Sequence, residues 1–109
     1  MIFENLTILY VEDEQIVRET LSSMIGDIFK EFITAQNGQD GYEKYEENQD
    51  KIDLVITDIN MPELNGFNMM KKINKINADI PFIVSSAYND KKFFRNINEF
   101  EMQFLFINL

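Results

Sequence analysis

Five short apolar runs, separated by stretches with helical periodicity, constrain the fold of this chain more than any other feature of its sequence. The runs cover residues 6–11, 32–35, 52–57, 80–85 and 103–108. Each is apolar at consecutive positions more than at alternate ones, which predicts strands that are buried on both faces. Such strands belong to a sheet that helices cover on both sides.

The stretches between the runs predict four helices, over residues 14–28, 39–48, 66–76 and 89–100. Their apolar residues recur every three or four positions, as on the inner face of a helix that packs on a sheet. The expected inner-face residues are Val17, Leu21, Met24, Ile25 and Ile28 in the first helix, Tyr42 and Tyr45 in the second, and Phe67, Met70 and Ile73 in the third.

Strands and helices therefore alternate along the whole chain. Right-handed crossovers then give an open, doubly wound α/β fold with a parallel sheet. The 109 residues are enough for one hydrophobic core, so we expect a single domain over 1–109. In such folds the functional site lies at the carboxyl ends of the strands.

The composition excludes several classes of function. The chain has no cysteine and no histidine, which rules out disulfides, thiolate metal sites and any imidazole base. A formal net charge of −9 disfavours nucleic acids and anionic membrane surfaces, and favours cations. The N-terminal segment has no basic region and only a short apolar run, so we predict a cytoplasmic protein without a signal peptide.

Acidic and hydroxyl residues follow three of the predicted strands. Glu12 and Asp13 follow the first, Asp58 follows the third, and Ser86 follows the fourth. If the first and third strands are neighbours, the three carboxylates converge, and a hard divalent cation such as Mg²⁺ or Mn²⁺ would offset their repulsion. A carboxylate beside such a cation can accept a phosphoryl group as an aspartyl phosphate.

Each of these residues also has a simpler interpretation. Asp13 suits the N-cap of the first helix, Asp58 is a common turn residue, and Ser86 is a small polar residue at a strand end. Their grouping at one end of one sheet favours a shared site over three separate causes.

Three segments give the chain a resemblance to a known family. They are ILYVEDE with Glu12 and Asp13, DLVITDINMPELNG with Asp58, and PFIVSSAYND with Ser86. Their order and spacing resemble the receiver domain of response regulators in two-component signalling, from about Thr7 onward. The resemblance implies a flavodoxin-like five-stranded sheet in the order 2-1-3-4-5.

The resemblance also implies roles for individual residues. Asp58 would accept a phosphoryl group from a sensor histidine kinase, and the hydroxyl of Ser86 would act as the conformational switch. Asp13, Asp58 and the backbone carbonyl of Asn60 would bind Mg²⁺ directly, with Glu12 assisting. The domain would be a signalling switch and not an enzyme, with no nucleic-acid or membrane partner.

The C-terminal part departs from the family pattern. Asn108 stands where the family has a lysine, Glu101 stands where it has a glycine, and the aromatic switch position falls near Leu105. The family's final helix also has no counterpart after the fifth strand. Either the chain is a fragment of a longer receiver, or the domain is truncated there and a partner subunit covers its end, and we expect self-association through the apolar C-terminal segment.

These departures leave a second function open. The chain could be a degenerate pseudo-receiver, a protein-interaction module that works without phosphorylation. An enzyme on the same fold fits less well. A flavin-binding protein needs a phosphate-binding loop where this chain has VEDE, and a dehalogenase-type phosphatase needs a second acid where it has Asn60.

Overall fold

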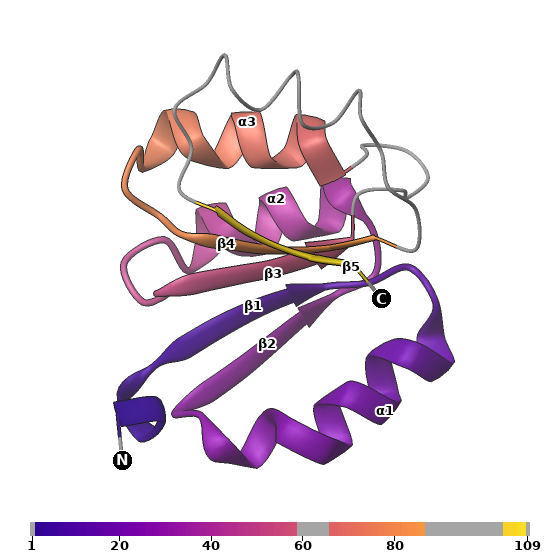
Figure 1. Ribbon diagram of the computed structural model, residues 1–109. Coiled ribbons are helices and arrows are strands. Elements are labelled where there is room, and N and C mark those ends of the chain that lie inside the picture. The colour runs from indigo at the N-terminus through magenta and orange to yellow at the C-terminus, as the bar shows by residue number, and fades with distance from the viewer. Residues whose placement is uncertain (1, 59–65, 87–103, 109) are drawn as a thin grey trace.

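The computed structural model describes residues 2–58, 66–86 and 104–108. For Ile2, Ser86 and residues 104–108 it describes the backbone alone. Five parallel strands form one sheet in the order β2-β1-β3-β4-β5 (Figure 1). This confirms the predicted fold class and strand order. The strands are β1 (Thr7–Val11), β2 (Glu31–Ala35), β3 (Leu54–Asp58), β4 (Phe82–Ser86) and β5 (Phe104–Asn108).

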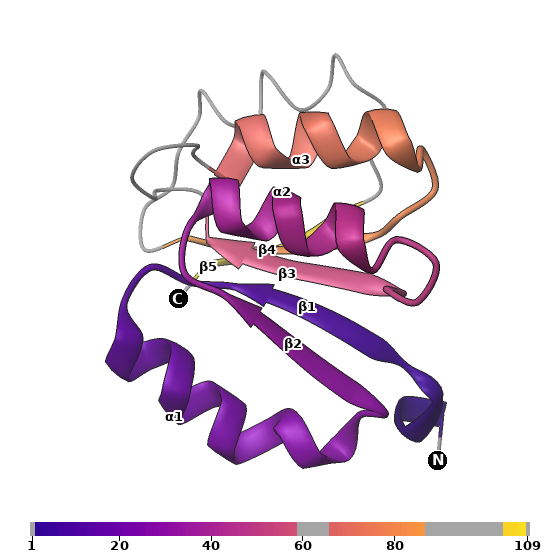
Figure 2. The ribbon, with the colours of Figure 1, turned by 180° about the vertical axis from the view of Figure 1, so that it is seen from behind.

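Three described helices cover the two faces of the sheet. They are α1 (Gln15–Ile25), α2 (Gly38–Glu47) and α3 (Gly66–Ile76), and a short 3-10 turn (Gly26–Ile28) extends α1. Figures 1 and 2 show α2 and α3 side by side on one face and α1 on the other, beside β1 and β2. The predicted helix over 89–100 lies outside the described residues. None of the described helices is long and apolar enough to cross a membrane.

The hydrophobic core lies between the sheet and the α2–α3 layer. Alternate residues of the central strands point into it, among them Val11, Val55 and Val84, all fully buried. Helix α2 contributes Tyr45 and α3 contributes Met70, both also fully buried. The predicted inward positions of α2 and α3 are therefore largely confirmed, with Met69 as a further buried residue and Tyr42 and Phe67 partly buried at its margin.

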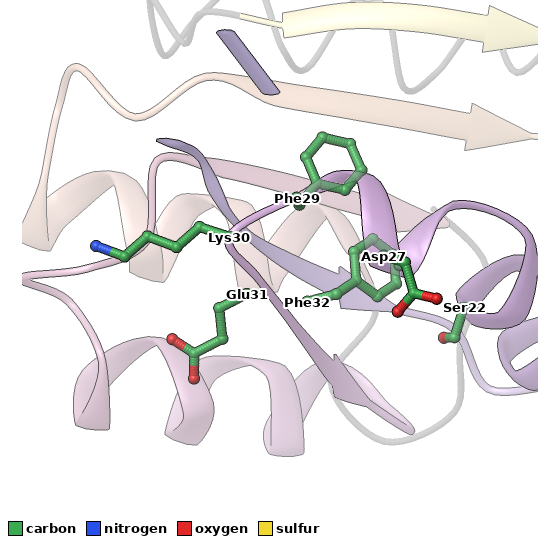
Figure 3. A pocket seen from close by; sticks show the side chains of 7 residues that line it. Ser22, Asp27, Phe29, Lys30, Glu31 and Phe32 are labelled. Atoms are coloured by element: carbon green, nitrogen blue, oxygen red, sulfur yellow. The ribbon is translucent and has the colours of Figure 1, made fainter. Parts of the chain in front are cut away.

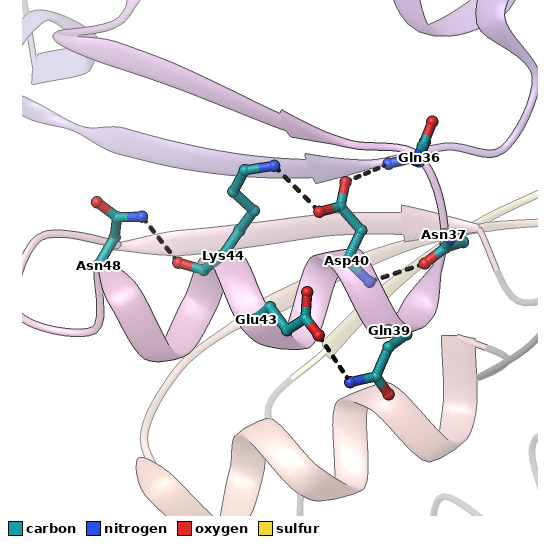
Figure 4. Close-up of polar contacts among 7 residues, drawn as sticks. All are labelled: Gln36, Asn37, Gln39, Asp40, Glu43, Lys44 and Asn48. Carbon is teal, nitrogen blue, oxygen red and sulfur yellow. Dashed lines mark hydrogen bonds and ion pairs between the residues drawn. The ribbon is translucent and has the colours of Figure 1, made fainter.

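The start of α2 is fixed by side chains that replace missing helical hydrogen bonds (Figure 4). The side-chain oxygen Oδ1 of Asn37 accepts a hydrogen bond from the Asp40 backbone N–H at 2.7 Å. The Asp40 carboxylate accepts one from the Gln36 N–H at 3.0 Å and pairs with Lys44 at 3.1 Å. These contacts satisfy exposed backbone donors and start the helix at Gly38, next to the predicted turn.

The prediction for the first helix is wrong in one respect. Its expected inner face is not buried: Met24 is 72% exposed, Val17 41% and Ile28 41%. The helix itself also ends at Ile25, three residues early. The physical reason is that α1 lies against β1 and β2, and no second described helix shares its face of the sheet.

At Gly41, helix α2 packs closely against the sheet and α3. A Cβ atom at this position would lie 2.6 Å from the Met69 sulfur and 2.9 Å from a methyl group of Val11. The sulfur can move, but the Val11 methyl belongs to a short side chain that is buried on a central strand. The close packing of α2 on Val11 and Met69 therefore requires glycine at position 41.

We expect Gly41→Ala to lower the free energy of unfolding by about 1–3 kcal/mol, because the added methyl overpacks this contact. Gly26→Ala is the matched control. Its Cβ would lie 3.8 Å from Phe32 at a helical φ of −57°, so it should be neutral or stabilising. Urea unfolding followed by circular dichroism measures both. Equal stability of the two variants would show that the α2–sheet contact tolerates a methyl group.

Candidate metal centre

Three carboxylates meet at the carboxyl edge of the sheet. Strands β1 and β3 are neighbours, with Val11 in register with Thr57, so the residues after β1 reach the end of β3. One carboxylate oxygen from each of Glu12, Asp13 and Asp58 lies within 4.8 Å of the other two. The predicted convergence of these three residues is therefore confirmed.

Glu12 is held in place by both its backbone and its side chain. Its N–H donates to the Ala35 carbonyl at 3.0 Å, and its own carbonyl accepts from the Arg18 guanidinium at 2.8 Å. Its carboxylate accepts a hydrogen bond from the Glu14 N–H at 3.1 Å. The residue is 8% exposed. These contacts fix a buried carboxylate beside two half-buried ones.

The N-cap interpretation of Asp13 is wrong. The N-cap residue of α1 is Glu14, with φ −83° and ψ 114°, and its side chain makes no capping hydrogen bond. Asp13 lies one residue earlier, half-buried among the three carboxylates. Its position fits a ligand of a cation better than a helix cap.

The electrostatics of the site favour a bound cation. Burial, together with the nearby Asp13 and Asp58, raises the pKa of Glu12 to about 7. The hydrogen bond from the Glu14 N–H lowers this pKa and offsets part of the rise. Burial and the negative charges of Glu12 and Asp58 also raise the pKa of Tyr10 to about 12. Three crowded carboxylate oxygens are the hard donor set that Mg²⁺ and Mn²⁺ prefer, so the residues fit such an ion.

Asp58 is the last residue of β3 and not the first of the following loop. It lies in register with Ser85 of β4, and Ser86 ends that strand in register with Asn108 of β5. Asn60 and the side chains of Ser86 and Asn108 lie outside what is described. Their predicted roles therefore stay predictions.

Two residues near the site were not predicted. Arg18, in the first turn of α1, donates a hydrogen bond to the Glu12 carbonyl. Tyr10 lies close enough to Glu12 and Asp58 that their negative charges help to raise its pKa. Tyr10 could have been found, because residues two apart on a strand point to the same face. The Arg18 contact has no such signal, since it depends on how α1 docks.

The comparison with protein families decides the class of the chain. Residues 8–105 match the sequence model of the response regulator receiver domain. The chain belongs to this family.

Curated relatives agree with this assignment. The chain is 32% identical over 88 residues to the two-component response regulator ARR12 of Arabidopsis thaliana, which covers 81% of this chain and 15% of that protein. It is 35% identical over 86 residues to the response regulator RR06 of Streptococcus pneumoniae, with 79% of this chain and 38% of that protein covered. The chain thus spans well under half the length of these relatives.

Solved structures show the same fold. The N-terminal domain of a Wolinella succinogenes protein superposes with a TM-score of 0.83 at 35% identity, covering 94% of this chain and 81% of that one. The response regulator protein TrrA of Thermotoga maritima, solved in complex with Mg²⁺ and a beryllium fluoride, has a TM-score of 0.78 at 28% identity. It covers 95% of this chain and 86% of that one.

The raised pKa of Glu12 predicts a pH dependence of stability. Its ordinary value is 4.5 and its value in the fold is about 7, so the folded chain binds more protons between these values. The contribution of this group is therefore fully present below about pH 4.5 and is lost as the pH rises through 7. Without divalent metal, the melting temperature should fall from pH 5 to pH 8.

Glu12→Gln should flatten that fall, because a neutral amide replaces the buried charge. The control is Glu47→Gln, at an exposed position at the end of α2, which should leave the pH profile unchanged. Scanning calorimetry without and with Mg²⁺ makes the test. A profile that Glu12→Gln does not alter would show that this carboxylate is not the titrating group.

Proposed function

We propose that this chain is a phosphoacceptor receiver domain that takes a phosphoryl group on Asp58 from a sensor histidine kinase. The observation that carries the proposal is the position of Asp58 at the carboxyl end of β3, beside Glu12 and Asp13. Family membership supports the same role. The domain acts as a switch within a phosphorelay, in the cytoplasm, and not as a metabolic enzyme.

The chemistry needs one nucleophile and one leaving group. A carboxylate oxygen of Asp58 attacks phosphorus and forms a new O–P bond, while the P–N bond to the donor histidine breaks and its electron pair returns to the imidazole nitrogen. Hydrolysis later transfers the phosphoryl group to water and restores the carboxylate. The sheet holds Asp58 in place for both steps.

A divalent ion would be held by Asp13, Asp58 and the Asn60 carbonyl, with Glu12 assisting. Mg²⁺ or Mn²⁺ bound there would neutralise part of the negative charge of the carboxylates and of the incoming phosphoryl group. The clustering of Glu12, Asp13 and Asp58 supports this assignment. So do receiver structures solved with Mg²⁺, such as that of TrrA.

The alternative, a pseudo-receiver that works without phosphate, is not favoured. A module of that kind gains nothing from three mutually repelling carboxylates in one place, one of them with its pKa raised to about 7. Without a bound cation, the mutual repulsion of these carboxylates destabilises the folded chain.

The proposed partners follow from the same role. A sensor histidine kinase would supply the phosphoryl group, as membership of the response regulator receiver family implies. The net charge of −9 argues against nucleic acids and membranes as partners.

Incubation with Mg²⁺ and a small phosphodonor should add one phosphoryl group to the chain, as seen by intact-mass spectrometry. Asp58→Asn should abolish the adduct, because the amide is not a nucleophile. Asp53→Asn is the matched control, since Asp53 lies at the other end of β3 and accepts a hydrogen bond from the Thr7 N–H. An adduct that persists in Asp58→Asn would place the phosphoacceptor elsewhere.

The position of Asn108 predicts weak switching. A neutral amide supplies no positive charge to a phosphoryl group, so we expect Asn108→Lys to strengthen the conformational response to phosphorylation. The change in amide chemical shifts of Ser85 and Ser86 on adding beryllofluoride and Mg²⁺ measures the response. Identical shift changes in the unmodified chain and in Asn108→Lys would show that a positive charge at position 108 does not strengthen the response.

The C-terminal strand predicts self-association. Strand β5 pairs with β4 alone among the described strands, so its outer edge can pair with another chain. Sedimentation velocity should show a mass that rises with concentration. Replacing Phe106 by proline should keep the chain monomeric, and a wild-type monomer at all concentrations would contradict the prediction.

A further inference from the structure

Arg18 of α1 holds the backbone of the acidic loop that follows β1. Its guanidinium Nη1 donates a hydrogen bond to the Glu12 carbonyl at 2.8 Å, and its backbone N–H donates to the Glu14 carbonyl at 2.9 Å. The hydroxyl of Ser22, one turn further along the helix, donates to the Arg18 carbonyl at 2.7 Å. One residue of α1 is therefore bonded to the residues on both sides of Asp13.

The two sides of the carboxylate cluster are fixed in different ways. Asp58 is the last residue of β3, and that strand pairs with β1 on one side and with β4 on the other. Glu12 and Asp13 instead follow Val11, the last residue of β1. The Glu12 N–H still donates to the Ala35 carbonyl, and the loop then leaves the sheet. The position of this loop therefore depends on side-chain contacts more than the position of Asp58 does.

The direction of the Glu12 carbonyl affects where the Asp13 side chain can point. A peptide unit is planar, so fixing the Glu12 carbonyl also fixes the Asp13 N–H. This leaves fewer backbone rotations by which the Asp13 carboxylate could turn away. Repulsion acts in the opposite sense, because one oxygen from each of Glu12, Asp13 and Asp58 lies within 4.8 Å of the other two.

We propose that Arg18 is a positioning residue for the metal centre. It holds the Glu12–Asp13 peptide so that the Asp13 carboxylate stays beside Asp58, where a divalent ion would bind. The inference rests on the proposed function, since it assumes that a cation binds between these carboxylates. Arg18 acts through the backbone of the loop and not through contact with the ion.

Arginine suits this role for chemical reasons. Its guanidinium is planar, permanently charged and rich in N–H donors. A hydrogen bond from a charged donor is stronger than one between neutral groups, so it can resist the repulsion among the carboxylates. The long side chain also lets a helical residue reach back six positions along the chain, to the Glu12 carbonyl.

A second interpretation of Arg18 predicts the opposite effect on a bound ion. A positive charge close to the three carboxylates repels a divalent cation and competes with it in neutralising them. If this charge were the main effect, removal of Arg18 would tighten ion binding. If positioning is the main effect, removal of Arg18 weakens ion binding. The sign of the change therefore separates the two interpretations.

The test compares the affinity of Arg18→Met, Arg18→Lys and the unmodified chain for Mn²⁺, measured from the EPR signal of the free ion. Loss of a group that orients a metal ligand typically weakens binding about tenfold or more, and we expect this of Arg18→Met. Arg18→Lys restores a charged donor, so its affinity should fall between the other two. The charge interpretation predicts the reverse order, with Arg18→Met as the tightest binder.

Lys30→Met is the matched control, because it removes one positive charge near the other end of α1. Lys30 precedes Glu31, which is in register with Thr7, so it lies at the end of the sheet away from the carboxylates. Figure 3 shows Lys30 beside a hollow of about 410 Å³ that Asp27 and Glu31 also line. Lys30→Met should bind Mn²⁺ within about twofold of the unmodified chain, since its charge is far from the ion.

A second readout needs no metal ion. The Glu14 N–H donates to the Glu12 carboxylate at 3.1 Å, and its hydrogen exchange in the metal-free chain should be faster in Arg18→Met. The Val55 N–H, which donates to the Pro81 carbonyl, should keep its exchange rate. A general loss of stability would raise both rates, so the pair separates local release of the loop from weaker folding.

Two results would overturn the proposal. Tighter Mn²⁺ binding by Arg18→Met would show that the residue acts through its charge. Unchanged exchange at Glu14 would show that the loop keeps its position without Arg18. Failure of the proposed metal centre would look different: the unmodified chain would bind no Mn²⁺, while the exchange rates of Glu14 and Val55 would still decide whether Arg18 holds the loop.

Discussion

The parallel pairing of β1 with β3 is the constraint on which the site depends. It brings Glu12, Asp13 and Asp58 close enough that one oxygen from each lies within 4.8 Å of the others. Three carboxylates at that distance repel one another, and burial adds to the cost, as the raised pKa of Glu12 records. The core packing of the sheet on α2 and α3 holds them there, so the fold stores an unfavourable interaction that a cation can relieve.

The two faces of the sheet have different roles in the structure. On one face α2 and α3 bury the core, with Gly41 allowing α2 to come close to Val11 and Met69. On the other face α1 connects to the site through the contact from Arg18 to the Glu12 carbonyl.

Much of the arrangement could be predicted from the sequence, because it depends on local patterns. Apolar runs and helical spacing predict the sheet and α3 from Gly66 to Ile76, and strand-end logic predicts the meeting of Asp58 with Glu12 and Asp13. Burial along α1 could not be predicted, because its periodicity shows an apolar flank but not whether another element covers it. The Arg18 contact and the role of Glu14 as N-cap depend on docking, which periodicity does not encode.

The most direct test of this account is a crystal structure of the chain grown with Mg²⁺ and beryllofluoride, a phosphoryl mimic. The account predicts a beryllium atom bonded to a carboxylate oxygen of Asp58, with Mg²⁺ held between that group and Asp13. A fold that is intact but carries neither group at Asp58, at concentrations that saturate other receivers, would contradict it. So would an ion bound away from Glu12, Asp13 and Asp58.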